Sequence, residues 1–194
     1  MAEFDDKHLE DANQDFLSRQ GDDITQAAAE VQEGTQAAVF FVGNMLMLDD
    51  GIGHAAFEEL QKRFIIPNNV QLFDVGCMSL DMIHYVNECS FIMTVDAVDS
   101  SDEPAGTVFR YTPDDVARGG MRQSLHDLKL SDLFDAASLL GYNSIGLCLG
   151  MQVENAEPEE YTVGLSRPCA EKLPLLTETI AAELHARGFI LERR

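Results

Sequence analysis

From residue 37 onward the chain alternates short apolar runs with segments of helical periodicity, and this alternation limits the possible folds more than any other feature. Residues 37–42 form an unbroken apolar run, which is typical of a strand buried on both faces of a parallel sheet. Residues 51–64 then place apolar side chains on one helical face. We therefore predict an α/β fold: a three-layer α/β/α sandwich around a mostly parallel, five-stranded sheet.

One strand of the predicted sheet is expected to run against the others. Residues 107–112 follow the strand at 90–98 after a connection of only eight residues. A parallel return needs a crossover of about a dozen residues or more, so this strand should be antiparallel and lie at an edge. The predicted strands are 37–42, 68–74, 90–98, 107–112 and 144–152, and the predicted helices are 51–64, 80–88, 131–140 and 168–188, with Gly188 as the stop of the last.

The first 36 residues differ in composition from the rest of the 194-residue chain. They hold ten acidic and two basic residues, with few apolar side chains before the first strand. Such a segment buries too little apolar surface to offset its ordering entropy. We expect residues 1–36 to be a flexible or loosely helical tail that adds little stability, and residues 37–194 to form the one folded domain.

The charge balance restricts the classes of partner. The chain has 13 basic and 34 acidic residues, a formal net charge of -21, which repels phosphate backbones and anionic lipids but attracts basic peptides and metal cations. No apolar run approaches the roughly 18 residues of a membrane span, and the N-terminus is too acidic for a signal peptide. We expect a cytoplasmic monomer that binds neither nucleic acid nor membranes. The four cysteines form no CxxC pair and should be free thiols.

Four aspartates lie near the carboxyl ends of the first three predicted strands, where open α/β sheets bind their ligands. Asp49 and Asp74 are expected to cap a helix or form a turn, the usual role of Asp between a strand and a helix. Asp96 instead interrupts an apolar run, and its pattern alone leaves functional and structural roles equally open. The carboxylates of these three residues and of Asp50, the fourth aspartate, are expected to share one rim of the sheet.

A histidine is expected at the same rim. His126 lies just before the helix at 131–140, which precedes the last strand and must run opposite to it. Taken alone, such a histidine is more often structural, but an imidazole beside Asp50 and Asp96 would suit a divalent metal of intermediate hardness. His54, four residues after Asp50, could supply a second nitrogen, although a half-buried helix residue is the favoured interpretation.

These segments together resemble one family, the endopeptidases that mature the large subunit of nickel-iron hydrogenases. The resemblance covers nearly all of residues 38–188. It is carried by the order and spacing of the stretches VGNMLMLDDGIGHAAFEEL, FDVGCMSLDM, FIMTVDAVDSSDEPAGTVFRY, SLHDLKLSDLF and YTVGLSRPCAEKLPLLTETI.

The resemblance implies roles for particular residues. Asp50 matches the family's first metal-contacting acid, Asp96 the second and His126 the histidine, and the two acids are the implied catalytic residues of an aspartic-type enzyme. A substrate-facing loop would contain Asp74, Gly76 and Cys77. The chain departs from the family pattern in that loop, with Val75 in place of the first of two glycines and Ser79 where Gly or another small residue is common.

The implied activity is removal of a C-terminal extension from a nickel-loaded large-subunit precursor. Nickel would arrive with the substrate, so the enzyme would hold no tightly bound cofactor of its own. The resemblance leaves open whether an acid activates water beside the metal or whether the three residues only dock nickel and position the peptide.

Two other functions stay open at this point. The first is a non-catalytic nickel-handling module that binds the precursor without cutting it. The second is a nucleotide-binding regulatory domain, suggested by the glycines of VGNMLMLDDGIG between a strand and a helix. The second is the weaker, because the stretch lacks GxGxxG spacing and a P-loop lysine.

Overall fold

The computed structural model describes residues 36–76, 82–99, 102–112, 115, 133–142 and 144–194. The predicted N-terminal tail, except for its last residue, lies outside these ranges, as do Cys77 and His126. No helix among the described residues is long and apolar enough to cross a bilayer.

A five-stranded sheet forms the centre of the domain. Its strands are β1 (Ala37–Val42), β3 (Val70–Gly76), β4 (Phe91–Val98), β5 (Val108–Tyr111) and β6 (Ile145–Gln152). They lie in the order β3-β1-β4-β6-β5, and all neighbours are parallel except β5, which is antiparallel to β6 at one edge. The predicted sheet is confirmed, including its antiparallel edge strand.

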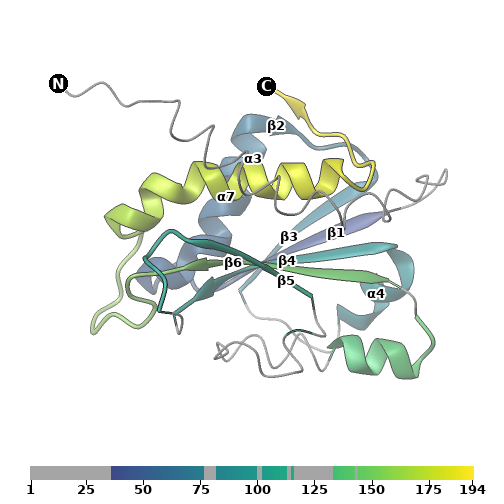
Figure 1. Ribbon diagram of the computed structural model, residues 1–194, viewed down its shortest axis with the longest axis horizontal. Coiled ribbons are helices and arrows are strands. Elements are labelled where there is room, and N and C mark those ends of the chain that lie inside the picture. Colours follow the sequence, from purple (N-terminus) through teal and green to yellow (C-terminus); the bar gives the residue numbers. More distant parts are fainter. Residues whose placement is uncertain (1–35, 77–81, 100–101, 113–114, 116–132, 143) are drawn as a thin grey trace.

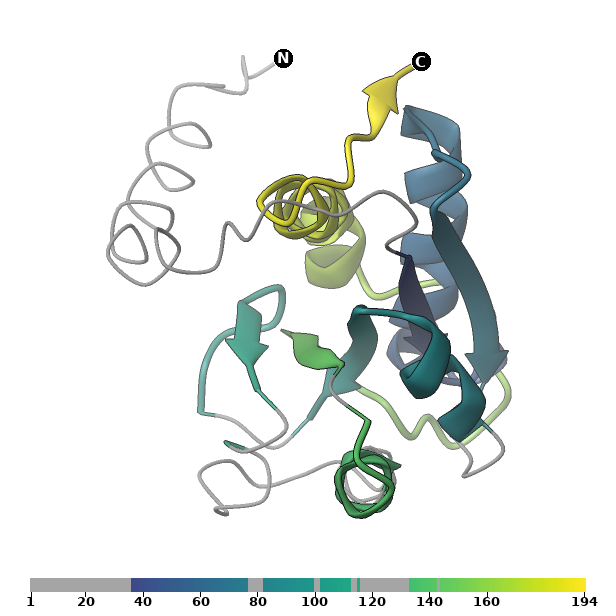
Figure 2. The same ribbon diagram turned by 90° about the vertical axis from the view of Figure 1, so that its right-hand side faces the viewer.

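Helices cover both faces of this sheet (Figure 1). On one face lie α3 (Ile52–Arg63) and α7 (Arg167–His185). On the other lie α4 (Ile83–Glu88) and the helical residues 133–139, as the view along the sheet shows (Figure 2). The arrangement is the predicted three-layer sandwich, with a single-turn helix, η1 (Leu48–Gly51), between β1 and α3.

The core has two parts because strand side chains alternate between the two faces of the sheet. In β4, Met93 and Val95 pack toward α3 and α7, whereas Ile92 packs toward α4 and residues 133–139. Every residue of β1 and β4 is buried, as expected for central parallel strands. Asp96 is therefore a polar residue inside an otherwise closed strand.

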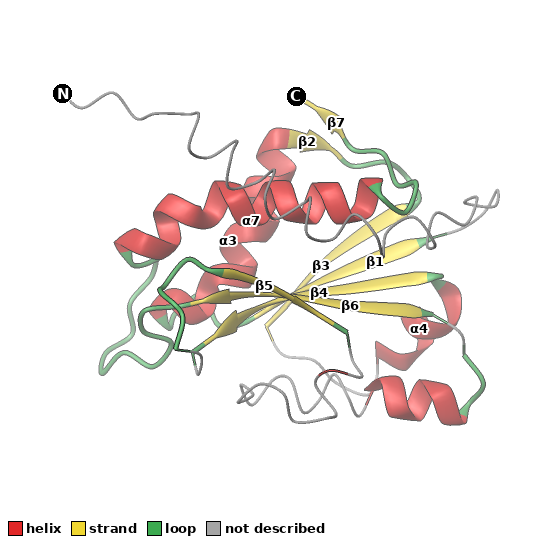
Figure 3. Cartoon of the chain, viewed as in Figure 1, coloured by secondary structure: helices red, strands yellow, loops and turns green. Residues whose placement is uncertain are grey.

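A second, two-stranded sheet was not predicted. β2 (Phe64–Ile65) pairs antiparallel with β7 (Glu192–Arg193), beside the far ends of α3 and α7 (Figure 3). Arg193 stacks on the Phe64 ring and binds Glu178 at 2.7 Å. The pairing fastens the end of the chain to the end of α3, and runs of two residues are too short to show strand periodicity.

Two glycines allow the start of α3 to lie close to the end of β1. Gly43 has a φ of +119°, and a Cβ there would lie 1.8 Å from the backbone oxygen of Asp50. A Cβ on Gly53 would lie 2.1 Å from the backbone oxygen of Val42. Any larger residue at these positions would push η1 and its two aspartates away from the sheet.

Candidate functional site

Asp50 lies in η1, and the loop that follows β1 binds its carboxylate. The backbone N–H of Asn44 donates to Asp50 Oδ2 at 2.7 Å, and the Asn44 side chain in turn accepts from the backbone N–H of Leu46 at 3.0 Å. The backbone N–H of Asp50 donates to the carbonyl of Met47 at 3.1 Å. These bonds hold the half-buried Asp50 carboxylate in a defined place at the rim.

The neighbouring Asp49 is fully buried and binds a distant loop. Its carboxylate accepts three backbone N–H groups, from Glu154 and Asn155 at 3.1 Å each and from Ser166 at 2.7 Å. The prediction that Asp49 caps a nearby helix or turn is wrong, because neither η1 nor α3 has a side-chain cap. Asp49 does satisfy backbone N–H groups, as predicted, but these groups belong to the loop between β6 and α7.

Asp96 lies in β4, one residue beyond the last pair that this strand makes with β1. Its side chain is buried, and the backbone N–H of Ala97 donates to its Oδ1 at 2.8 Å. By alternation it points to the same face as Ile92, the face covered by α4 and residues 133–139. Residues of η1 lie within 8 Å of β4, Cα to Cα, so Asp50 and Asp96 occupy neighbouring elements.

Asp74 binds a histidine instead of forming a turn. The predicted strand 68–74 is observed at 70–76, so Asp74 lies within β3, opposite Phe41 of β1, and does not end the strand. Its Oδ2 lies 2.6 Å from Nδ1 of His54 in the first turn of α3. His54 is half-buried, as predicted, but sequence reasoning missed this contact.

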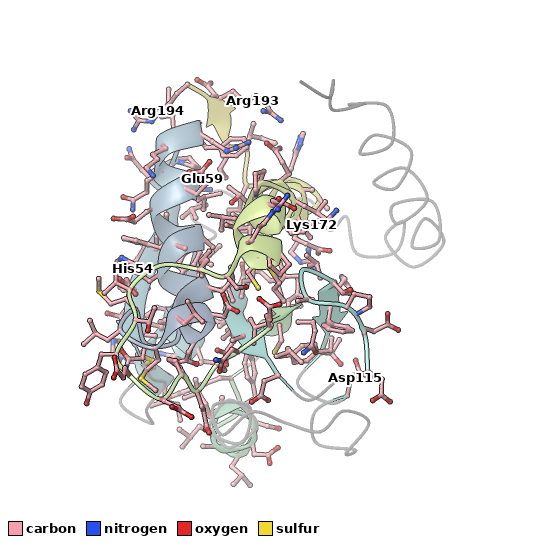
Figure 4. The ribbon with its side chains drawn as sticks, turned by 90° about the vertical axis from the view of Figure 1, so that its left-hand side faces the viewer. His54, Glu59, Asp115, Lys172, Arg193 and Arg194 are labelled. Carbon is pink, nitrogen blue, oxygen red and sulfur yellow. The ribbon has the colours of Figure 1, made fainter. Side chains whose placement is uncertain are left out.

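The His54–Asp74 pair lines a pocket of about 620 Å³ at this end of the sheet. Figure 4 shows His54 at the end of α3 remote from Arg193 and Arg194. Both side chains are partly open to solvent, at 24% for His54 and 31% for Asp74. The pocket is lined by Gly43, Asn44, Met45, His54, Asp74, Val75 and Gly76.

The predicted substrate-facing loop is only partly described. Asp74 and Gly76 line the pocket, and the Gly76 carbonyl accepts the backbone N–H of Gly43 at 2.8 Å. Cys77 lies outside the described residues. Burial raises the pKa of the Cys89 and Cys169 thiols, which keeps both in the protonated form that is a poor nucleophile.

The third predicted metal contact lies beyond what the structure describes. Asp50 and Asp96 are placed, but His126 falls in the range 116–132. Within the described ranges no group of three or more His, Cys, Asp and Glu side chains is arranged to hold a metal ion. The three-ligand site, and with it the catalytic roles of the two acids, therefore stays a prediction.

The described rim combines two carboxylates on adjoining elements with a pocket lined by His54, Asp74 and the residues that follow β1. Carboxylates can accept a proton from water or ligate a divalent cation, and the pocket beside them is open to solvent at His54 and Asp74. The rim therefore suits hydrolysis of a peptide segment beside a cation better than binding of an anion.

Comparison with known proteins identifies a family of proteases. The model of the hydrogenase maturation protease family named HycI matches residues 55–183. The hydrogenase expression/formation protein HupD of Thiocapsa roseopersicina is 30% identical over 159 residues, which span 80% of this chain and 71% of that protein. HupD of Bradyrhizobium diazoefficiens is 35% identical over 105 residues, 53% of this chain and 54% of that protein, so this second match covers about half of the relative's length.

Solved structures show the same fold. The hydrogenase maturating endopeptidase HybD from Escherichia coli superposes with a TM-score of 0.73, covering 82% of this chain and 98% of HybD at 24% sequence identity. The two chains thus share the same α/β fold.

Proposed function

This chain belongs to the hydrogenase maturation protease family, and we propose that it removes the C-terminal extension of a nickel-loaded hydrogenase large-subunit precursor. Nickel belongs to the substrate in this proposal, and the protease holds no tightly bound cofactor of its own. The observation that carries the proposal is the pair of aspartates, Asp50 and Asp96, on adjoining elements at the carboxyl rim of the family's fold.

The donor set supports contact with the nickel of the precursor. Asp50 and Asp96 supply two carboxylates, and His126 supplies an imidazole nitrogen if the segment before residues 133–139 reaches the rim. Two oxygens and one nitrogen suit a divalent metal of intermediate hardness. Three ligands also leave positions for groups of the substrate, as in open metal sites.

The same acids can serve the chemical step. Peptide hydrolysis needs a group that takes a proton from the attacking water and a group that steadies the charge developing on the scissile carbonyl oxygen. We assign the proton of the attacking water to one of the two carboxylates, which returns it to the leaving amine nitrogen as the C–N bond breaks, and this makes the enzyme aspartic-type. The substrate's nickel would polarise the scissile carbonyl. The extended tail would lie in the pocket that Gly43, Asn44 and Gly76 help to line.

The net charge of the chain restricts which partners it binds. A net charge of -21 opposes binding to nucleic acid and to anionic membranes, and it favours a cationic substrate region. We therefore propose that the protein acts as a monomer in the cytoplasm, on the precursor before the large subunit closes over its metal centre.

Incubation of the full chain with nickel-loaded and nickel-free precursor tests the proposal. Intact mass spectrometry should show loss of one C-terminal peptide from the nickel-loaded precursor alone. Binding of the nickel-loaded precursor without any loss of mass would contradict the proposal and support a non-catalytic nickel-handling module. Equal cutting of both forms would contradict the role of nickel.

A further inference from the structure

Two loops far apart in the sequence are joined at the rim. Residues 44–48 follow β1, and residues 160–164 belong to the connection between β6 and α7. The backbone N–H of Thr162 donates to the carbonyl of Leu46 at 2.8 Å, and the backbone N–H of Leu48 donates to the carbonyl of Thr162 at 2.7 Å. Met47 and Thr162 thus form a parallel bridge that makes one continuous surface of the two loops.

Large apolar side chains on these loops are open to solvent. Tyr161 is 82% exposed and Val163 is 68% exposed, and Met45 and Leu46 on the other loop are each more than two-fifths exposed. We call these four residues, Met45, Leu46, Tyr161 and Val163, the two-loop surface. Adjacent exposed apolar side chains on hydrogen-bonded loops are typical of an interaction site.

The two-loop surface is preformed. The Asp49 carboxylate binds both ends of the 154–166 connection, at Glu154 and Asn155 on one side and at Ser166 on the other. Binding of a partner here therefore costs little conformational entropy of the loops. More of the free energy of its apolar contacts then contributes to affinity.

The surface adjoins the candidate site. Met45 lines the pocket together with His54 and Asp74, and its neighbour Asn44 binds the Asp50 carboxylate. A peptide lying on the two-loop surface can continue into the pocket, because Met45 belongs to both.

The charges near the two-loop surface indicate which kind of segment binds it. The connection 154–166 carries four exposed glutamates, Glu154, Glu157, Glu159 and Glu160, and no Lys, Arg or His. The N-terminal 36 residues hold ten acidic and two basic side chains, and a second copy of the chain brings a charge of -21, so like charge opposes both. A basic segment of another protein is favoured.

We propose that the two-loop surface binds a segment of the large-subunit precursor that carries apolar and basic residues close to the bond to be cut. The inference rests on the proposed function, whose substrate it makes more specific. The apolar side chains supply affinity, and the glutamates supply orientation and a fast, salt-dependent association.

Steady-state processing of nickel-loaded precursor by a Tyr161→Ser/Val163→Ser double variant tests the apolar part. KM should rise about tenfold with kcat unchanged, since loss of two anchoring side chains removes about 1.4 kcal/mol of binding free energy. The matched control is Leu139→Ser/Leu140→Ser, which removes apolar residues that are 89% and 58% exposed away from the rim and should leave KM unchanged.

A triple variant, Glu157→Gln/Glu159→Gln/Glu160→Gln, tests the charge. KM should rise at low salt, and the dependence of KM on salt should weaken relative to the wild type. A wild-type KM for the Tyr161→Ser/Val163→Ser variant would overturn the inference. So would sedimentation showing that the wild type dimerises and this variant does not, because the surface would then bind a second copy.

These outcomes are separable from failure of the proposed function. If wild-type protein does not cut the precursor at all, the proposed function fails, and binding of the precursor by calorimetry still reports on the surface. Unchanged affinity of the Tyr161→Ser/Val163→Ser variant in that measurement would likewise overturn the inference.

Discussion

The rim has two sides that are built in different ways. On one side the fully buried Asp49 accepts three backbone N–H groups and ties η1 to a loop more than 100 residues away. On the other, His54 and Asp74 share one contact between partly exposed side chains at the edge of a pocket. Substitutions in the first arrangement should lower the free energy of unfolding strongly, whereas substitutions in the second should lower it only a little.

This contrast separates stability from specificity. A buried carboxylate that satisfies three backbone donors cannot be replaced without leaving some of them unpaired. A half-exposed pair is worth less, because solvent screens it and competes for its groups. We therefore expect the Asp49 side of the rim to hold the site together, and the His54–Asp74 side to adjust which substrate fits.

The largest expected effect is that of Asp49→Ala. Removing the carboxylate leaves the N–H groups of Glu154, Asn155 and Ser166 without their acceptor in a partly buried place. The free energy of unfolding, measured by urea titration, should fall by about 2–4 kcal/mol. A loss below about 0.5 kcal/mol would show that the loop is held in other ways and would remove the contrast between the two sides.

A smaller loss is expected for Asp49→Asn. The amide keeps one oxygen acceptor but turns its NH₂ toward one of the backbone donors, so at least one of the three bonds is lost. The free energy of unfolding should fall by about 1–3 kcal/mol. Processing of nickel-loaded precursor, expressed per folded molecule, should stay close to wild type, and its loss would assign Asp49 a direct role in the reaction.

His54→Ala should have the smallest effect on stability. It removes the 2.6 Å contact with Asp74, and solvent can take its place, so the free energy of unfolding should fall by less than about 1 kcal/mol. Glu58→Gln is the matched control, since Glu58 lies 3.9 Å from the other ring nitrogen of His54 and should change nothing measurable. A loss in the free energy of unfolding as large as that of Asp49→Ala would show that the two sides of the rim do not differ in stability.

Most of the fold could be predicted from the sequence because it depends on local patterns. The apolar runs gave every strand of the main sheet to within about two residues, and the short connection before residues 107–112 gave the antiparallel edge. The β2–β7 pair could not be predicted, since its two-residue strands carry no periodic signal.

The site was harder to predict because its contacts are not local. The sequence shows that Asp49 follows a strand, but nothing in it indicates that its hydrogen-bond donors lie 105 to 117 residues further on. The His54–Asp74 contact was within reach, since α3 connects β1 to β3 and brings its first turn near the carboxyl end of both. We missed it by ending the strand at Asp74.

The most direct test of the central claim compares Asp96→Asn with Asp99→Asn on nickel-loaded precursor. Asn keeps the shape of the buried Asp96 side chain but removes its charge, whereas Asp99 is an exposed acid just beyond the same strand. With circular dichroism and Tm confirming that both variants fold, intact mass should show an uncut precursor with Asp96→Asn and a cut one with Asp99→Asn. Cleavage at the wild-type rate by Asp96→Asn would contradict the account.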